Sequence, residues 1–321
     1  MQIPSNPLPD VPEVARIPGA ELRTIALDGV GWRYWFAGSG APLLLIHGFM
    51  GFSFSWRFNV AHLAQHFSVY AIDLPGCGFS QRSDLRQRTI GEDAEAVLAF
   101  MDHFGIERTD IIASSRGGGV TIVLAGLLAA SDQLHRMRRV ILVSPINPWS
   151  KYGQLLTRIL ATAAGGWFAV HILPRLHFLM TRYLKRLYGD PGRISPGTVE
   201  GYRSGLEVPG SFQHLERIVR SWAGDLKQIG ESLPALIRVP ALLLWGSLDR
   251  AVYPESAEEL HRRLPGSSLH IMDGVGHLPY EEVPGEFNRV VCDFLLSDAR
   301  ASTPQAGMGA EMETDKIPAR P

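Results

Sequence analysis

The sequence contains few of the features that would place it in a specialised class. Only two of its 321 residues are cysteines, Cys77 and Cys292, so a disulfide framework is excluded. A reducing, cytoplasmic environment is the simpler expectation, although a single bridge between them is formally compatible with the sequence. The net charge is −1, which provides no basic field for nucleic acid.

Signals for targeting and for bound groups are equally scarce. The N-terminus, MQIPSNPLPDVPEVARIPG, has no basic stretch followed by an apolar one, so we expect no secretory signal. The longest central stretch without Lys, Arg, Asp or Glu, Ile159–Pro174, has 16 residues and is too short to span a bilayer comfortably. The chain has neither closely paired cysteines nor a G-x-x-x-x-G-K-[ST] phosphate loop, so we expect no metal and no cofactor.

What is present is an alternation of short apolar runs with helical patterns. This alternation predicts an α/β fold: a mostly parallel eight-stranded sheet with helices on both faces. The predicted strands are Arg23–Leu27, Trp32–Phe36, Leu43–His47, Val69–Asp73, Asp110–Ser114, Val140–Ser144, Ala241–Trp245 and Ser268–Met272. The predicted helices are Trp56–His66, Thr89–Phe104, Gly117–Ala130, Pro254–Leu264 and Gly285–Leu296.

The alternation stops between the sixth and seventh predicted strands, where residues 147–232 carry helical patterns and no clear strand. We interpret this segment as a helical cap inserted into a core made of residues 21–146 and 233–299. The proline-rich residues 1–20 are predicted to form an N-terminal arm. Residues 300–321 are small and polar, which is typical of a disordered tail.

The stretch IIASSRGGG, residues 111–119, is almost the G-x-S-x-G nucleophile elbow, a tight turn between a strand and a helix. Because the residues two before and two after the nucleophile crowd each other, both must be small. Ser115 is flanked in this way by Ala113 and Gly117, whereas Ser114 has the larger Ile112 and Arg116. Ser115 is therefore the candidate nucleophile. A glycine-rich turn with incidental serines is the alternative interpretation.

A serine needs a base to take its proton and a third group to orient that base. His277 follows the eighth predicted strand in a loop, where ligands meet an open α/β sheet. Asp249 follows the seventh strand; its alternative role is to cap a turn. The loop after the sixth strand offers Asn147 and no carboxylate. The candidates Ser115, Asp249 and His277 thus have the chain order of an α/β-hydrolase triad.

Five short segments in this order resemble the α/β-hydrolase superfamily, in its serine-nucleophile, esterase- or lipase-like branch. They are HGF at 47–49, DLPGCGFS at 73–80, ASSRG at 113–117, GSLD at 246–249 and GH at 276–277. The resemblance implies that the backbone amides of Phe49 and Arg116 form the oxyanion hole. It also implies that His47 braces loops, and Cys77 is most simply a small filler residue.

A serine nucleophile implies acyl transfer, whereas dehalogenases and epoxide hydrolases of this superfamily attack with an aspartate. The leading hypothesis is a hydrolase of hydrophobic carboxylic esters. The alternatives are a carbon–carbon bond hydrolase of ring-cleavage-type substrates and a non-catalytic ligand-binding or accessory protein. Thioester, amide and lactone hydrolysis use the same residues.

The cap combines basic and apolar residues. Between Lys151 and Arg193 the sequence has seven basic residues and one acid, Asp190, interspersed with many aromatic and aliphatic side chains. Such a segment can line an acyl-chain pocket or make peripheral contact with an anionic membrane. Alternatively, its apolar face packs on the core while its arginines are solvated. The sequence does not define the oligomeric state.

Overall fold

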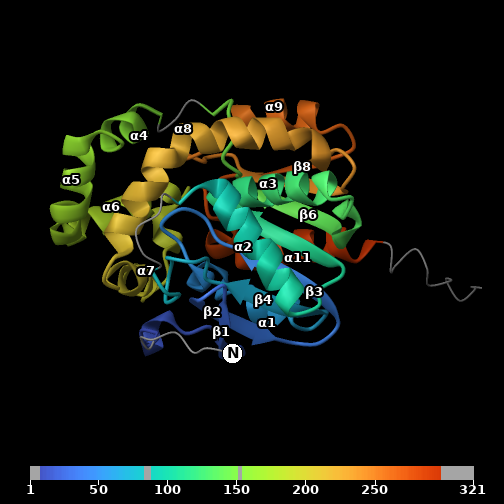
Figure 1. Cartoon of the computed structure of the whole chain (residues 1–321), viewed down its shortest axis with the longest axis horizontal. Coiled ribbons are helices and arrows are strands. Elements are labelled where there is room, and N and C mark those ends of the chain that lie inside the picture. The colour runs from blue at the N-terminus through green and yellow to red at the C-terminus, as the bar shows by residue number, and fades with distance from the viewer. Residues whose placement is uncertain (1–7, 83–87, 151–153, 298–321) are drawn as a thin grey trace, which may run out of the picture.

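A computed structural model describes residues 8–82, 88–150 and 154–297 of the chain (Figure 1). Its centre is one eight-stranded sheet in the order β1-β2-β4-β3-β5-β6-β7-β8. β1 and β2 are antiparallel to their neighbours, and all later pairs are parallel, which confirms the predicted sheet. The strands are β1 Glu21–Leu27, β2 Val30–Ala37, β3 Ala41–Ile46, β4 Phe67–Ile72, β5 Thr109–Ser114, β6 Met137–Val143, β7 Ala241–Gly246 and β8 Ser268–Met272.

Helices cover both faces of this sheet. The α-helices are α1 Val60–Leu63, α2 Ile90–His103, α3 Arg116–Ala130, α4 Gln154–Leu160, α5 Ala163–His171, α6 His177–Leu187, α7 Thr198–Leu206, α8 Ser211–Leu236, α9 Glu255–Arg263, α10 Pro279–Glu282 and α11 Pro284–Leu295. Short 3-10 helices are η1 Glu13–Ala15, η2 Ser53–Trp56, η3 Leu134–Arg136, η4 Leu173–Arg175 and η5 Pro191–Arg193.

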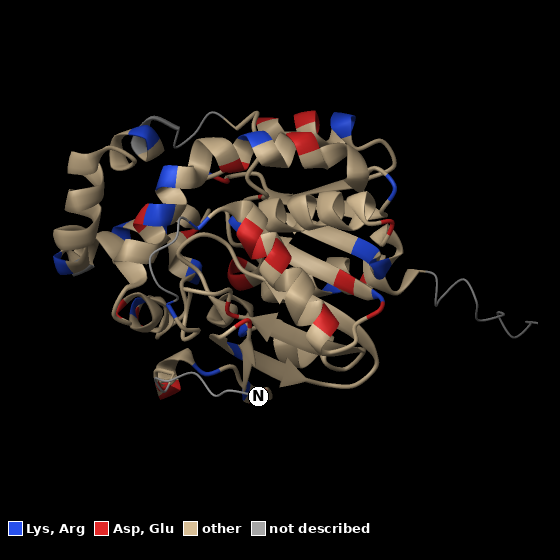
Figure 2. Cartoon of the chain, in the orientation of Figure 1, with Lys and Arg blue, Asp and Glu red and all other residues tan. Residues whose placement is uncertain are grey.

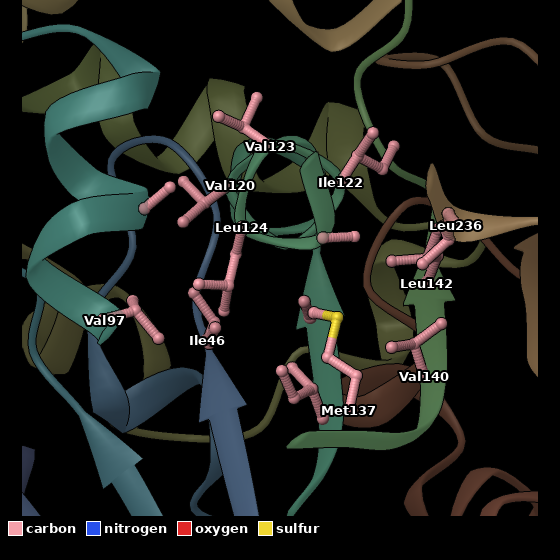
Figure 3. Packing of buried hydrophobic residues seen from close by; sticks show 14 of the residues in the cluster. Ile46, Val97, Val120, Ile122, Val123, Leu124, Met137, Val140, Leu142 and Leu236 are labelled. Atoms are coloured by element: carbon pink, nitrogen blue, oxygen red, sulfur yellow. The ribbon is translucent and has the colours of Figure 1, made fainter. Parts of the chain in front are cut away.

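The strand side chains alternate between two buried layers. Leu44 and Ile46 of β3 face a core built with α2, α3, α8 and α9, part of which is shown in Figure 3. Leu43 and Leu45 of the same strand face a second core built with η2, α1, α11 and the cap helices α6 and α7. Because each central strand is buried on both faces, its sequence is a continuous apolar run.

One predicted helix, Trp56–His66, is wrong in its extent. The segment forms η2, which ends at Trp56, and the single turn α1. Residues 57–59 separate the two, and the side-chain Nδ2 of Asn59 donates to the carbonyl of Tyr280 (3.1 Å) and to Asn288 Oδ1 (2.9 Å). These contacts with the α10–α11 region fix a turn that the local pattern of apolar residues does not encode.

Helices α4 to α8 lie between β6 and β7, in the segment interpreted as the cap, and α8 continues beyond the expected boundary at residue 232 to Leu236 (Figure 1). None of the helices within the described ranges combines the length and hydropathy needed to cross a bilayer. Neither Cys77 nor Cys292 forms a disulfide. The predicted tail, residues 300–321, lies outside the described residues.

Candidate active site

Ser115 occupies the sharp turn between β5 and α3. Its backbone angles, φ 51° and ψ −116°, are in a region that a non-glycine residue adopts at a cost of about 1–3 kcal/mol. The surroundings impose this conformation. The Ser115 amide donates to the carbonyl of Val143 (2.9 Å), and its carbonyl accepts from the amides of Gly118 (3.0 Å) and Ile146 (3.1 Å). Ser115 therefore has the backbone geometry of a nucleophile elbow.

Small residues around Ser115 make this turn sterically possible. A Cβ atom at Gly117 would lie 2.5 Å from the carbonyl oxygen of His47, and one at Gly48 would lie 3.0 Å from the Ser115 Cβ. Ala113 is fully buried in β5 and its methyl group is accommodated. Position 113 therefore requires a small side chain, whereas position 117 requires glycine.

Asp249 and His277 form a buried pair. His277 Nδ1 donates to Asp249 Oδ2 over 2.8 Å. The other carboxylate oxygen, Oδ1, accepts from the backbone amides of Ala251 (2.7 Å) and Val252 (2.9 Å). Because these amides orient the carboxylate, Asp249 also caps the turn after β7, the role that sequence reasoning treated as its alternative.

The loop of His277 is connected to the elbow by a side-chain contact. Three residues after His277, the hydroxyl of Tyr280 accepts a hydrogen bond from Ser114 Oγ (3.2 Å). β5, β7 and β8 are parallel, so the residues that follow them meet at one edge of the sheet. The two serines also differ: Ser114 is fully buried against Tyr280, whereas Ser115 is 9% exposed.

Two backbone amides adjoin Ser115 without an acceptor in the described part of the chain, those of Phe49 and Arg116. Arg116 is the first residue of α3, where the helix leaves its amide unpaired. Phe49 follows β3, next to Gly48, whose backbone approaches Ser115 closely. These are the two donors that the resemblance assigned to an oxyanion hole.

His47 holds the loop of Phe49 in place. Its Nε2 accepts from the amide of Leu74 (3.1 Å), and its Nδ1 donates to the carbonyl of Gly48 (2.9 Å). Burial lowers the pKa of His47, which keeps the ring neutral for these two roles. Asp73 fixes the same loop, because its carboxylate accepts from the amides of Ser53 (2.8 Å) and Phe79 (2.9 Å).

Sequence reasoning missed the role of the Arg116 side chain. It is buried and ion-paired with Asp93 of α2, and its Nη2 lies 3.7 Å from Asp225 of α8. Arg88 also pairs with Asp93 (2.6 Å). Burial alone would raise the pKa of Asp93, but Arg116 and Arg88 hold it below its ordinary value. The residue after Ser115 thus joins three helices.

Two consecutive glutamates, Glu281 and Glu282, were also missed. Glu281 pairs with Arg57 (2.8 Å) and accepts from the hydroxyl of Tyr188 (2.8 Å). Glu282 accepts from the amides of Gly189 and Asp190 (both 2.9 Å), which follow α6 within the cap, and from the amide of Gly276 (2.8 Å), directly before His277. In the sequence they resemble exposed acids in a first helical turn, because their partners are distant along the chain.

Two other residues considered in the sequence, Asn147 and Cys77, have structural roles. Asn147 Oδ1 accepts from the amides of Trp149 (3.1 Å) and Ser150 (3.0 Å), so it orders the loop after β6. Cys77 lies 3.5 Å from the Nε2 atom of His214 in α8, and burial raises the pKa of its thiol to about 12. A protonated, half-buried thiol matches the filler role expected from the sequence.

His62 and His66 have the H-x-x-x-H spacing found in metal sites, which sequence reasoning overlooked, but both side chains are exposed. Over the described ranges, no three His, Cys, Asp or Glu side chains cluster in a way that could hold a metal ion.

Comparison with known families agrees with the fold. A model of the alpha/beta hydrolase family matches residues 43–290. The chain belongs to this family. It is also 28% identical over 285 residues to an uncharacterised hydrolase of Bacillus subtilis (strain 168), covering 85% of this chain and 97% of the relative.

Two further relatives extend the comparison. A 2-hydroxy-6-oxo-2,4-heptadienoate hydrolase of Pseudomonas putida is 24% identical, with 86% of this chain and 96% of the relative covered. The crystal structure of an alpha/beta hydrolase fold protein from Burkholderia ambifaria superposes with a TM-score of 0.73 at 22% identity, covering 84% of this chain and 97% of that one. The latter similarity concerns the fold. The family match and the sequence relatives named as hydrolases support a hydrolase.

Proposed function

We propose that this alpha/beta hydrolase is a serine hydrolase that cleaves a hydrophobic carboxylic ester through an acyl-enzyme. The observation that carries the proposal is the strained turn at Ser115 in combination with the buried Asp249–His277 pair. A strained non-glycine residue needs a functional reason to persist, and presenting a hydroxyl at the edge of the sheet provides one.

In the proposed reaction, Ser115 Oγ attacks the ester carbonyl while His277 Nε2 takes the hydroxyl proton. Asp249 Oδ2 accepts from the Nδ1–H of His277 (2.8 Å), which orients the ring and stabilises the imidazolium. The developing oxyanion accepts from the amides of Phe49 and Arg116, each worth roughly 3–4 kcal/mol. His277 then protonates the leaving alcohol. Water repeats the sequence on the acyl-enzyme, and the carboxylic acid leaves with Ser115 restored.

The preference for an apolar ester is supported by an aromatic pair beside the site. The Phe49 ring packs edge-on against Trp222 of α8 at 5.6 Å, so aromatic side chains lie beside one of the oxyanion donors. Apolar surface of this kind favours an apolar substrate over a charged one.

A fluorophosphonate probe tests the nucleophile, because it forms a covalent bond only with an activated serine. We expect labelling of the wild-type protein and of Ser114→Ala, and none of Ser115→Ala. Labelling that persists in Ser115→Ala would refute the assignment. A folded, unlabelled wild-type protein that still binds apolar ligands would indicate a binding protein instead.

Carbon–carbon bond hydrolysis is the second candidate, and the Pseudomonas putida relative that acts on a 2-hydroxy-6-oxo-dienoate supports it. Both reactions use the same residues, so the substrate must discriminate between them. Steady-state kcat/KM is measured for p-nitrophenyl esters and for such a dienoate. The ester proposal requires the higher value for the esters, and the reverse order would favour the second candidate.

A further inference from the structure

Helix α5 presents its large side chains to solvent and its small ones to the protein. Trp167 is 58% exposed and Phe168 41% exposed, and Ala163, Ala164 and His171 are exposed beside them. These five positions recur at the spacing of one helical face. The opposite face contains Gly165 and Gly166, and Gly166 is buried. A helix that packs on a protein core normally has the reverse arrangement.

The close packing of the glycine face fixes this orientation. A Cβ atom at Gly166 would lie 2.5 Å from Glu216 Oε1 of α8, and one at Gly165 would lie 2.1 Å from the carbonyl of Ile159. Because the contact at Gly165 is with a backbone atom, that position admits only glycine, whereas the contact at Gly166 is with the end of a glutamate side chain. Rotating the helix to bury Trp167 would require a cavity that these contacts exclude, so the aromatic face is held outward by the fold.

The neighbouring helices extend this surface. Ile159 of α4 is 52% exposed and Phe178 of α6 is 62% exposed. Between Gln154 and Leu187 the sequence has five basic residues and no acid. In Figure 2, α4 and α6 therefore contain blue segments, α5 contains none, and none of the three helices contains a red one. All five basic residues are exposed: Arg158, Arg175, Arg182, Lys185 and Arg186.

We propose that this surface, made of α4, α5 and α6, docks on a bilayer that contains anionic lipids. Tryptophan and phenylalanine on an outward helical face insert at the level of the headgroups, and arginine and lysine next to them attract anionic headgroups. The charge favours a bilayer over an apolar protein surface, because the 34 residues from Gln154 to Leu187 include five basic residues and no acid. The proposal is independent of the reaction at Ser115.

The other occupants of such a surface are a second copy of the chain or a terminal segment. In Figure 1, α5 lies at one end of the molecule, and the last described helix, α11, ends on the opposite side. A symmetric dimer through α5 would bring the basic residues of both copies together, which like-charge repulsion opposes.

Co-sedimentation of the full chain with vesicles tests the proposal. One set of vesicles contains phosphatidylglycerol and phosphatidylcholine, and the other phosphatidylcholine alone, each at low and at high salt. The wild-type protein should bind the anionic vesicles at low salt and bind more weakly at high salt. The double variant Trp167→Ala, Phe168→Ala should bind the anionic vesicles about tenfold more weakly.

A charge variant and a matched control complete the design. Arg182→Gln combined with Lys185→Gln should weaken binding about tenfold to anionic vesicles and have no effect with phosphatidylcholine alone. The control Ile271→Ala removes an apolar side chain of 41% exposure from β8 and should bind like the wild type. Far-UV circular dichroism checks that each variant is folded.

Two results would overturn the proposal. The first is wild-type protein that stays in the supernatant with anionic vesicles at low salt. The second is double and charge variants that bind as well as Ile271→Ala. If the protein instead sediments as a dimer that Trp167→Ala, Phe168→Ala dissociates, α5 contacts a second copy and the membrane proposal fails. Fluorophosphonate labelling in the absence of vesicles reports on Ser115 separately.

Discussion

At the scale of single residues, the turn at Ser115 depends on a glycine two positions later. Because a Cβ atom at Gly117 would meet the carbonyl oxygens of His47 (2.5 Å) and Ile46 (2.6 Å), both of which are backbone atoms, no rotamer change can relieve the contact. Space for a side chain at 117 would have to come from moving β3 or α3, and α3 begins with the proposed oxyanion donor Arg116.

We therefore expect Gly117→Ala to lower the free energy of unfolding by about 1–3 kcal/mol and to slow fluorophosphonate labelling. Urea denaturation and labelling kinetics measure the two effects. Gly224→Ala is the control, since nothing lies within 4 Å of a Cβ atom at this position in α8. There the added methyl should stabilise the helix by roughly 0.5–1 kcal/mol. Equal effects at the two positions would contradict the steric argument.

The steric demand at the elbow could be predicted from the sequence because it acts between neighbours in the chain. Ala113 and Gly117 lie within two residues of Ser115, and their sizes are enough to identify the serine with room to turn. The pairing of Asp249 with His277 was predictable for another reason: each directly follows a strand, and parallel strands end at one edge. What the local sequence does not contain is the set of long-range partners of Arg116 and Glu282.

At the scale of elements, α8 connects the cap to the helices around the elbow. Its Asp225 accepts from the amide of Ile90, the first residue of α2 (3.0 Å), and from the hydroxyl of Ser221 (3.0 Å). Arg116 of α3 lies between this carboxylate and Asp93 of α2. Burying the Arg116 guanidinium costs little free energy only while both carboxylates are present. Removing one of them leaves buried charge without compensation.

Asp93→Ala should accordingly lower the free energy of unfolding by about 3–5 kcal/mol, as is typical when one partner of a buried ion pair is removed. Equilibrium denaturation in urea measures the loss. The control is Lys227→Ala, which removes an exposed pair with Glu231 (3.7 Å) on α8 and should change stability by less than about 0.5 kcal/mol. A loss at Asp93 as small as at Lys227 would show that the buried cluster contributes nothing.

Sequence reasoning was less accurate for elements set by tertiary contacts than for central strands. β7 is a continuous apolar run whose burial on both faces follows from its composition, and its bounds were predicted to within one residue. The helix expected at Trp56–His66 fails because Asn59 bonds to residues more than 200 positions away. The outward aromatic face of α5 depends on the glycine contacts with α4 and α8, and no local pattern indicates these.

At the scale of the whole molecule, a buried histidine makes stability depend on pH. His214 of α8 is buried over the loop of Gly76, and burial, only partly opposed by the nearby Asp93, lowers its pKa to about 3 from an ordinary value of 6.5. Between these two values the unfolded chain binds a proton that the folded chain does not. The free energy of unfolding is therefore undiminished by His214 above pH 6.5, and it declines as the pH falls from 6.5 toward 3.

The slope of this decline from His214 alone approaches about 1.4 kcal/mol per pH unit. His214→Gln should remove it, so the free energy of unfolding of the variant should fall less than that of the wild type when the pH is lowered through this window. Urea denaturation at several pH values measures both slopes. His103→Gln, at an exposed position of α2, should keep the wild-type slope. Identical slopes for all three proteins would exclude His214 as the source.

The contacts of Glu282 have a consequence for engineering by cap exchange. This single carboxylate holds Gly189 and Asp190, where the chain leaves α6, against Gly276, and the amide of His277 donates to the carbonyl of Leu187 (2.6 Å). The scaffold of the proposed general base is thus partly built from the segment that an engineer would replace. A chimera should therefore retain residues 187–190 of this chain. If the exchanged cap included them, the contacts that position His277 would change together with the substrate pocket.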